Sequence, residues 1–133
     1  MKSRIILILM VLFTQICYSQ IRIGYSKERL LTKEFVKEKA EIFSSHGQEC
    51  VMWQDENVLC LYGFDENDNS NWNFIEVKND EQLNFMIREY NKNYVPQSDS
   101  SWIMYSTNTS FKCKIKLLTM NGKKNIIVAS KND

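Results

Sequence analysis

The chain has 133 residues, with 17 basic and 16 acidic side chains, and its four cysteines include three outside the first twenty residues. This near-neutral balance gives no global attraction to nucleic acid or to an anionic membrane, so neither is expected as a partner. Three cysteines are too few for a disulfide scaffold, so a hydrophobic core must hold the fold.

Residues 1–19 have the pattern of a secretory signal peptide. Lys2 and Arg4 precede a short apolar run, and the small residue Ser19 stands before the expected cleavage site. The apolar run is shorter than the roughly 20 residues that span a bilayer, which predicts export rather than a membrane span. Residues 20–133 are then expected to form one secreted or periplasmic α+β domain, because they are too few for two cores.

The next stretch predicts a helix. Ser26 is a suitable N-cap, Glu28 favours the helix dipole, and Gly47 is a typical C-terminal breaker. The apolar side chains between them fall within one half of a helical wheel, which predicts a helix from 26 to 47. His46, the single histidine, is expected at the end of this helix, near its last carbonyl groups.

A three-stranded antiparallel meander is predicted after this helix. Three runs rich in β-branched and aromatic residues are separated by clusters of acidic and amide residues that favour turns. The expected strands are 51–53, 58–64 and 72–77.

A second helix and three further strands follow in the same order. Asn79 or Asp80 caps the helix, and Pro96 ends it. The expected strands are 102–106, 111–118 and 125–129. Strict alternation in 111–118 predicts one buried face that includes Cys113, and a solvent-facing row that consists of Lys112, Lys114 and Lys116.

The two halves match at an offset of 52 to 53 residues, which pairs Cys60 with Cys113. We interpret them as pseudo-repeats at about 26–78 and 79–130. The predicted fold class is α+β, a two-layer arrangement in which an antiparallel sheet of about six strands carries two helices on one face, from a tandem αβββ repeat. The alternative is that the helices and hairpins share this spacing by chance.

Two short motifs resemble small secreted bacterial proteins of uncharacterised function. Gly24-Tyr25-Ser26-Lys27-Glu28 is similar to their helix start, and Phe64 to Asn67 is similar to the segment that follows their second strand. The layout of helices and sheet also resembles that of the β-lactamase inhibitor proteins, which bind other proteins. The resemblance implies the two-layer fold and identifies no function.

One acidic segment resembles a calcium-binding EF-hand loop. Asp65, Asn67, Asn69 and Glu76 stand at loop positions one, three, five and twelve, where oxygen ligands are needed. However, Ser70 replaces the glycine that the sharp turn requires, and a strand precedes the loop instead of a helix. A polar hairpin loop is the favoured interpretation, so no cofactor is expected, and calcium stays an alternative.

The cysteines allow one disulfide. Cys50 and Cys60 lie symmetrically about Asp55, so a three-residue turn would place them opposite each other, within disulfide reach. A two- or four-residue turn would place the two sulfurs on different faces of the sheet, as buried free thiols. The sequence does not choose between these turns.

The sequence favours a non-catalytic binding module. No nucleophile with a base and no glycine-rich phosphate loop is present, and a single histidine makes a Ser-His or Cys-His centre unfavourable. Residues 49–81 carry nine acids and one lysine, while residues 100–133 carry six lysines and one acid, a separation that suits a complementary protein partner. The alternatives are that these charges only keep the sheet soluble, and that the protein is a calcium-dependent extracellular domain. The expected interaction residues are Trp72, Phe85, Lys112, Lys114 and Lys116.

Overall fold

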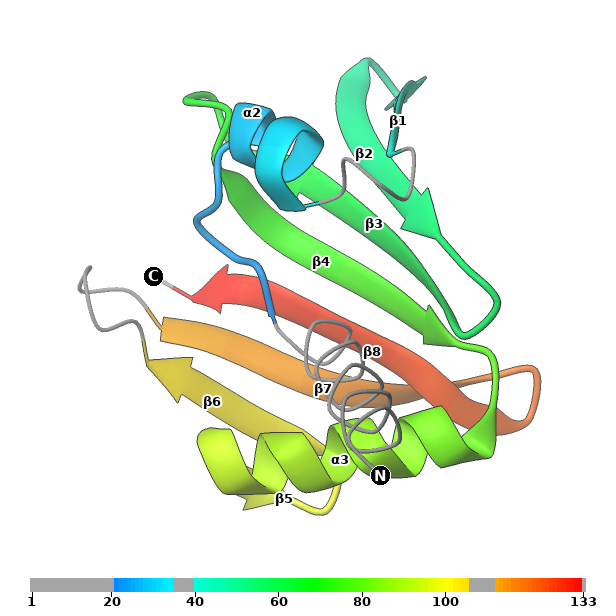
Figure 1. Ribbon diagram of the computed structural model, residues 1–133. Coiled ribbons are helices and arrows are strands. Elements are labelled where there is room, and N and C mark those ends of the chain that lie inside the picture. The colour runs from blue at the N-terminus through cyan, green and yellow to red at the C-terminus, as the bar shows by residue number, and fades with distance from the viewer. Residues whose placement is uncertain (1–20, 35–39, 106–111, 133) are drawn as a thin grey trace, which may run out of the picture.

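A computed structural model of the chain describes residues 21–34, 40–105 and 112–132 (Figure 1). The expected signal peptide lies outside these residues. Eight antiparallel strands form one sheet in the order β1-β2-β3-β4-β8-β7-β6-β5. The elements are α2 (Lys27–Arg29), the π-helical turn η1 (Leu30–Glu34), β1 (Glu41–Ser45), β2 (Gln48–Gln54), β3 (Val58–Phe64), β4 (Ser70–Val77), α3 (Asp80–Asn93), β5 (Val95–Ser98), β6 (Ser101–Tyr105), β7 (Lys112–Met120) and β8 (Lys123–Asn132).

The predicted fold class is wrong. The sheet has eight strands rather than about six, and each half of the chain contributes four strands rather than the three of an αβββ repeat. The helix predicted over 26–47 is absent as such, because α2 has three residues, η1 has five, and residues from Glu41 onward form strand β1. In the described part of the chain, α3 is therefore the only helix longer than two turns.

A hairpin turn explains why β1 replaces the end of the predicted helix. His46 and Gly47 have φ values of 50° and 79°, and they join the paired residues Ser45 and Gln48. Two consecutive residues with positive φ form the two-residue turn that suits the twist of a β-hairpin. Gly47 is predicted to end a helix, but its left-handed conformation belongs to this turn. His46 lies in the turn rather than at a helix end.

Helix α3 confirms the second predicted helix. The Asn79 side chain accepts a hydrogen bond from the Gln82 amide at 2.7 Å, as an N-cap does. The helix ends at Asn93, before Pro96. Its buried side chains face the sheet, and the Trp102 indole donates to the Asn91 side chain at 2.7 Å, which ties α3 to β6.

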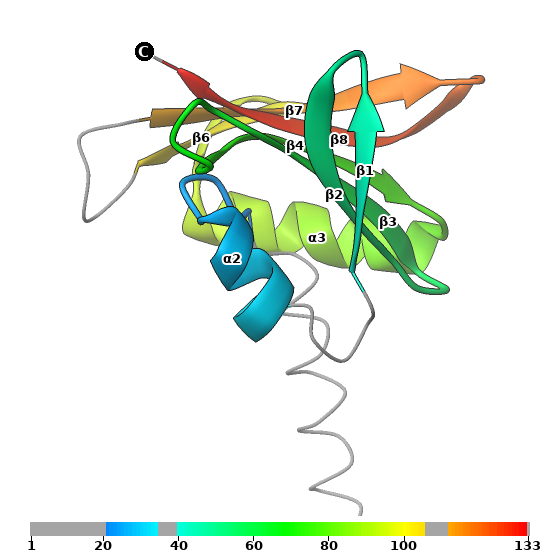
Figure 2. The ribbon, with the colours of Figure 1, turned by 90° about the horizontal axis from the view of Figure 1, so that it is seen from above.

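The core lies between the sheet and α3. The short N-terminal segment 21–25 also crosses this side, where Ile21, Ile23 and Leu30 are buried. Figure 2 shows α3 and the short α2 segment on one side of the sheet. No element of the described ranges covers the other side, which we call the open face.

The matching strands of the two predicted pseudo-repeats lie at corresponding places on either side of the centre of the sheet. β4 and β8 form its centre, β3 and β7 flank them, and β2 and β6 come next. The proposed residue match between Cys60 and Cys113 is nevertheless wrong in register. Ile75 of β4 and Ile127 of β8 pair with each other at the centre of the sheet. Cys60 lies opposite Ile75, and Leu117 lies opposite Ile127. Leu117 therefore occupies the place that corresponds to Cys60.

Candidate functional site

The open face carries large apolar side chains across its middle strands. Residues that pair across neighbouring strands share a face, so the register assigns each side chain to a side of the sheet. Eight residues on the open face, which we call the apolar block, are absent from the core cluster and are half-buried or buried: Cys50, Met52, Leu59, Leu61, Trp72, Phe74, Ile126 and Val128.

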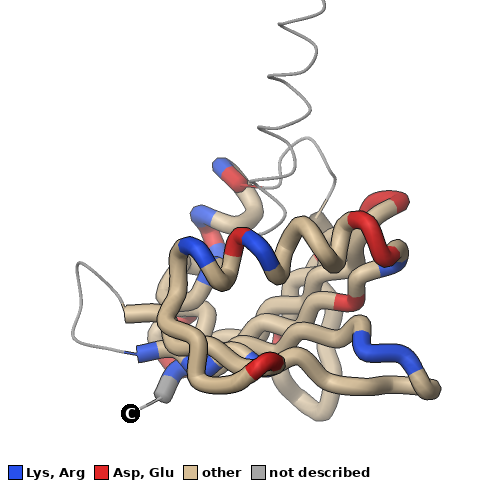
Figure 3. Tube along the Cα trace, turned by 90° about the horizontal axis from the view of Figure 1, so that it is seen from below, with Lys and Arg blue, Asp and Glu red and all other residues tan. Residues whose placement is uncertain are grey.

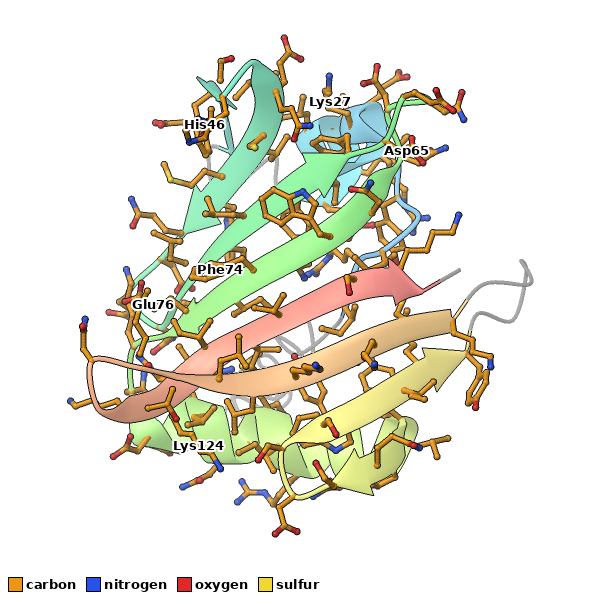
Figure 4. The ribbon with its side chains drawn as sticks, turned by 180° about the vertical axis from the view of Figure 1, so that it is seen from behind. Lys27, His46, Asp65, Phe74, Glu76 and Lys124 are labelled. Atoms are coloured by element: carbon orange, nitrogen blue, oxygen red, sulfur yellow. The ribbon has the colours of Figure 1, made fainter. Side chains whose placement is uncertain are left out.

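Phe74 lies at the centre of the apolar block (Figure 4). It pairs with Leu61 of β3 on one side and with Val128 of β8 on the other. The row continues to Met52 of β2 and, at the opposite end, to Lys116 of β7. This cross-strand row of the open face therefore has apolar side chains on β2, β3, β4 and β8 and a lysine on β7.

Trp72 is held flat on the open face by Gly63. The two residues pair across β3 and β4, and a Cβ atom added to Gly63 would overlap the indole ring of Trp72. Because Gly63 has no side chain, the indole ring of Trp72 can pack directly against its backbone. Sequence analysis selected Trp72 as an interaction residue, and the structure places its half-buried ring within the apolar block.

The three predicted lysines form an exposed row beside the apolar block. Lys112, Lys114 and Lys116 alternate along β7 with buried Cys113, Ile115 and Leu117, as the sequence pattern predicted. The amine of Lys112 lies 5.9 Å from the centre of the Tyr105 ring. Among the ion pairs of the described residues, none involves this row, so its positive charge is not neutralised there.

Phe85 does not join the other predicted interaction residues. It lies on α3 and packs, half-buried, against the core cluster on the helix side of the sheet. Trp72 and the lysine row lie on the open face, so the sheet itself separates them from Phe85. The structure therefore brings four of the five predicted interaction residues to one face.

Most of the apolar block is not among the predicted interaction residues. The sequences of β2 and β3 are apolar at both odd and even positions, and this pattern is the signal that could have found the block. A strand with two apolar faces is typical of a sheet that is buried on both sides, so it indicates a surface that a further element or a partner could cover. The predicted two-layer fold covers only one face of the sheet, so it gives Leu59, Leu61 and Phe74 no role.

The EF-hand pattern does not gather its four residues in space. Asp65 and Glu76 lie at opposite ends of the sheet in Figure 4, because Glu76 is inside β4, opposite Leu59. One Asp65 oxygen accepts hydrogen bonds from the Asn67 and Asn69 amides at 2.9 and 3.0 Å. The carboxylate thus caps its own turn. No group of metal-binding side chains is found within the described ranges.

Cys50 and Cys60 are not placed for a disulfide. The observed register pairs Cys50 with Gly63 and Trp53 with Cys60, so the two sulfurs lie on different faces of the sheet. Glu56 and Asn57 form the tip of this hairpin, with the Asp55 amide bonded to the Val58 carbonyl at 3.0 Å. The turn is therefore not the three-residue turn that a disulfide would need.

The buried thiols are poor nucleophiles. Burial raises the pKa of Cys60 to about 12 and that of Cys113 to about 11. The thiolate is the reactive form of cysteine, so both side chains stay protonated and inert near neutral pH. Cys113 is fully buried, as its place on the apolar face of its strand predicted.

A depression lies between the β1–β2 hairpin, the β3–β4 turn and the start of α2. It has a volume of about 320 Å³. The Lys27 amine lies 2.7 Å from a Glu49 oxygen and 3.2 Å from an Asp68 oxygen, and these hydrogen bonds raise its pKa. It also lies 5.5 Å from the centre of the Phe64 ring. Lys27 thus neutralises part of the acidic lining and joins three segments.

The charges that are separate along the sequence do not form two opposite poles. Figure 3 shows basic and acidic segments together at one end of the sheet. The β7–β8 turn brings Lys123 and Lys124 to that end, where the acids of the β2–β3 turn and of the first turn of α3 also lie. Among the described residues, charge separation is therefore local, as in the lysine row of the open face and the acidic lining of the depression beside Lys27.

Within the described residues, no helix has the length and apolarity needed to cross a bilayer. Comparisons with protein-family models, with curated proteins and with solved structures found no match to this chain. The case for a function therefore depends on the geometry of the open face.

Proposed function

We propose that this chain is an exported, non-catalytic binding protein that docks another protein on the open face of its sheet. The observation that carries the proposal is the apolar block, which includes Trp72 and Phe74 and lies uncovered beside a lysine row that forms no ion pair among the described residues. Contiguous apolar surface of this kind marks interaction sites in soluble proteins.

Charge complementarity specifies the partner. The open face offers an apolar centre and a positive border along Lys112, Lys114 and Lys116. A partner surface with an apolar centre and a carboxylate-rich border would match both parts. In such a complex the aromatic side chains supply most of the affinity, whereas the lysines set orientation and encounter rate.

Glu76 favours a protein over a lipid surface as the partner. Its half-buried side chain lies on the open face between Leu59 and Ile126, within the apolar block. Insertion of this face into a bilayer would bring a carboxylate into hydrocarbon, which is expensive. A protein partner can instead provide a hydrogen-bond donor for the same carboxylate.

The N-terminal sequence supports export, and the buried thiols support a non-catalytic role. Residues 1–19 favour export, and the high pKa values of Cys60 and Cys113 support a role without covalent catalysis. The calcium-dependent alternative gains no support, because Glu76 lies far from the Asp65 turn along β4 (Figure 4).

Site-specific photo-crosslinking tests the proposal directly. A photoreactive phenylalanine derivative placed at position 74 reports on the open face, and the same group at exposed position 88 of α3 is the matched control. We expect one discrete protein adduct from position 74 in the native extracellular fraction and none from position 88. Equal labelling from both positions would contradict the proposal.

Two sets of charge reversals then test the lysine row. Lys112, Lys114 and Lys116 changed together to Glu should abolish the adduct, while the same change at Lys33, Lys92 and Lys123 should leave it intact. Trp72→Ala should weaken the isolated complex by more than about 1 kcal/mol. Sedimentation with anionic lipid vesicles in the absence of any protein adduct would overturn the choice of partner.

A further inference from the structure

The two edges of the sheet differ in how they are protected. β5 carries Pro96 and a register irregularity between Pro96 and Ser98, and it packs against α3. Proline, bulges and a covering helix are devices that keep an edge strand from pairing with another chain. β1, at the other edge, has the sequence Glu-Ile-Phe-Ser-Ser, without proline, lysine or a bulge.

The β1–β2 hairpin shows which main-chain groups of β1 point outward. A two-residue turn is closed by a hydrogen-bonded pair, here Ser45 with Gln48, and hydrogen-bonded and non-bonded pairs then alternate along the ladder. Phe43 and Glu41 therefore direct their amide and carbonyl groups toward β2. Ile42 and Ser44 direct theirs away from the sheet, where no described strand pairs with them.

The residues of β1 are complementary to a second copy of β1 in the antiparallel direction. A twofold axis through Phe43 places Ile42 opposite Ser44 of the other copy, so their outward groups meet. Glu41 then lies opposite Ser45 of the other copy, which avoids two like charges in one pair. The side chains of Ile42 and Phe43 are 51% and 36% exposed, so the pairing would bury apolar surface.

We propose that β1 pairs with β1 of a second copy of this chain, so that two eight-stranded sheets become one continuous sheet. The open faces of the two copies join along Phe43, because Phe43 pairs with Cys50 of the apolar block. One short strand per copy makes a small interface, so the association is weak and depends on concentration. The dimer would present two apolar blocks and two lysine rows on one side.

Sedimentation equilibrium of the purified protein over a concentration series tests this proposal. We expect the average mass to rise toward that of a dimer. Ser44→Pro removes an outward amide without breaking a bond to β2, and it should weaken association at least about tenfold. Ser44→Ala keeps the amide and is the control. A mass that stays monomeric for the unchanged chain, or a dimer indifferent to Ser44→Pro, would overturn the proposal.

A charge-swap experiment tests the register even if the proline variant does not fold. Phe43 faces its own copy across the twofold axis, so Phe43→Lys and Phe43→Glu should each be monomeric, since two like charges would meet. An equimolar mixture of the two variants should form dimers. Failure of the mixture to associate, with both variants melting as the unchanged chain does, would show that position 43 is not on the axis.

Discussion

Strand β7 shows the two faces of the sheet side by side. Cys113, Ile115 and Leu117 are buried on the helix side, while the lysines between them are exposed on the open face. On the central strands the same alternation separates fully buried residues such as Ile75 from half-buried ones such as Phe74. The helix side therefore holds the fully buried core, while the open face carries half-buried large side chains that no described element covers.

The largest expected difference between the two faces is in unfolding free energy. Ile115→Ala opens a cavity on the helix side and should lower the free energy of unfolding by about 2–5 kcal/mol. Lys114→Ala, one residue away on the open face, should change it by less than about 0.5 kcal/mol. Urea unfolding of both variants checks this. Similar decreases in the free energy of unfolding for the two variants would mean that the open face also contributes to stability.

Gly63→Ala tests whether Trp72 is fixed on the open face. The added methyl group would overlap the indole ring, and its displacement should lower the free energy of unfolding by about 1–3 kcal/mol. Because Trp72→Ala removes the ring, the double variant should recover much of this loss. A double-mutant cycle from urea unfolding measures the coupling. Additive effects would show that the ring does not lie on Gly63.

Alkaline pH should weaken the helix side through its thiols. An unfolded thiol ionises near pH ~8.5, whereas burial raises the pKa of Cys113 to about 11. Between these values the folded chain keeps a proton that the unfolded chain has lost, so the free energy of unfolding falls as pH rises. Cys113→Ala should flatten the decline in melting temperature between about pH 8.5 and 11. An equally steep decline in that variant would count against the assignment.

The smallest effect is expected from calcium. The Asp65 carboxylate caps the β3–β4 turn and Glu76 lies along β4, so calcium and a chelator should give the same melting temperature. Differential scanning fluorimetry is sufficient. A calcium-dependent rise of several degrees that disappears in Asp65→Ala and in Glu76→Gln would show that the loop rearranges to bind the ion.

Local signals predicted the parts of the fold that local physics determines. The Asn79 cap and Pro96 bracket α3, and the alternation of β7 separates lysines from core residues. The helix predicted over residues 41–45 is wrong because it depended on local signals alone. Adjacent apolar residues suit either a helix or a strand, and pairing with β2 decides between them.

The candidate site was only half predictable. Trp72 and the lysine row were found because aromatic and basic side chains stand out in a sequence. Phe74 and Leu61 do not stand out, because only the sheet order and the place of α3 reveal that no described element covers one apolar face of the sheet. The sequence does not show that Phe85 lies on the other side of the sheet from Trp72, because that placement depends on how α3 packs against the core cluster.

The position of β8 has a consequence for how the protein is made. β8 lies between β4 and β7 at the centre of the sheet, yet it is synthesised after the seven other strands. Until it emerges, the two halves have no shared ladder, and contacts so distant in sequence form late. If the chain is exported as we propose, this order delays assembly of the sheet until translation is well advanced. The ladders that join the two halves then cannot form before β8 is available, so a chain in transit lacks the centre of its sheet.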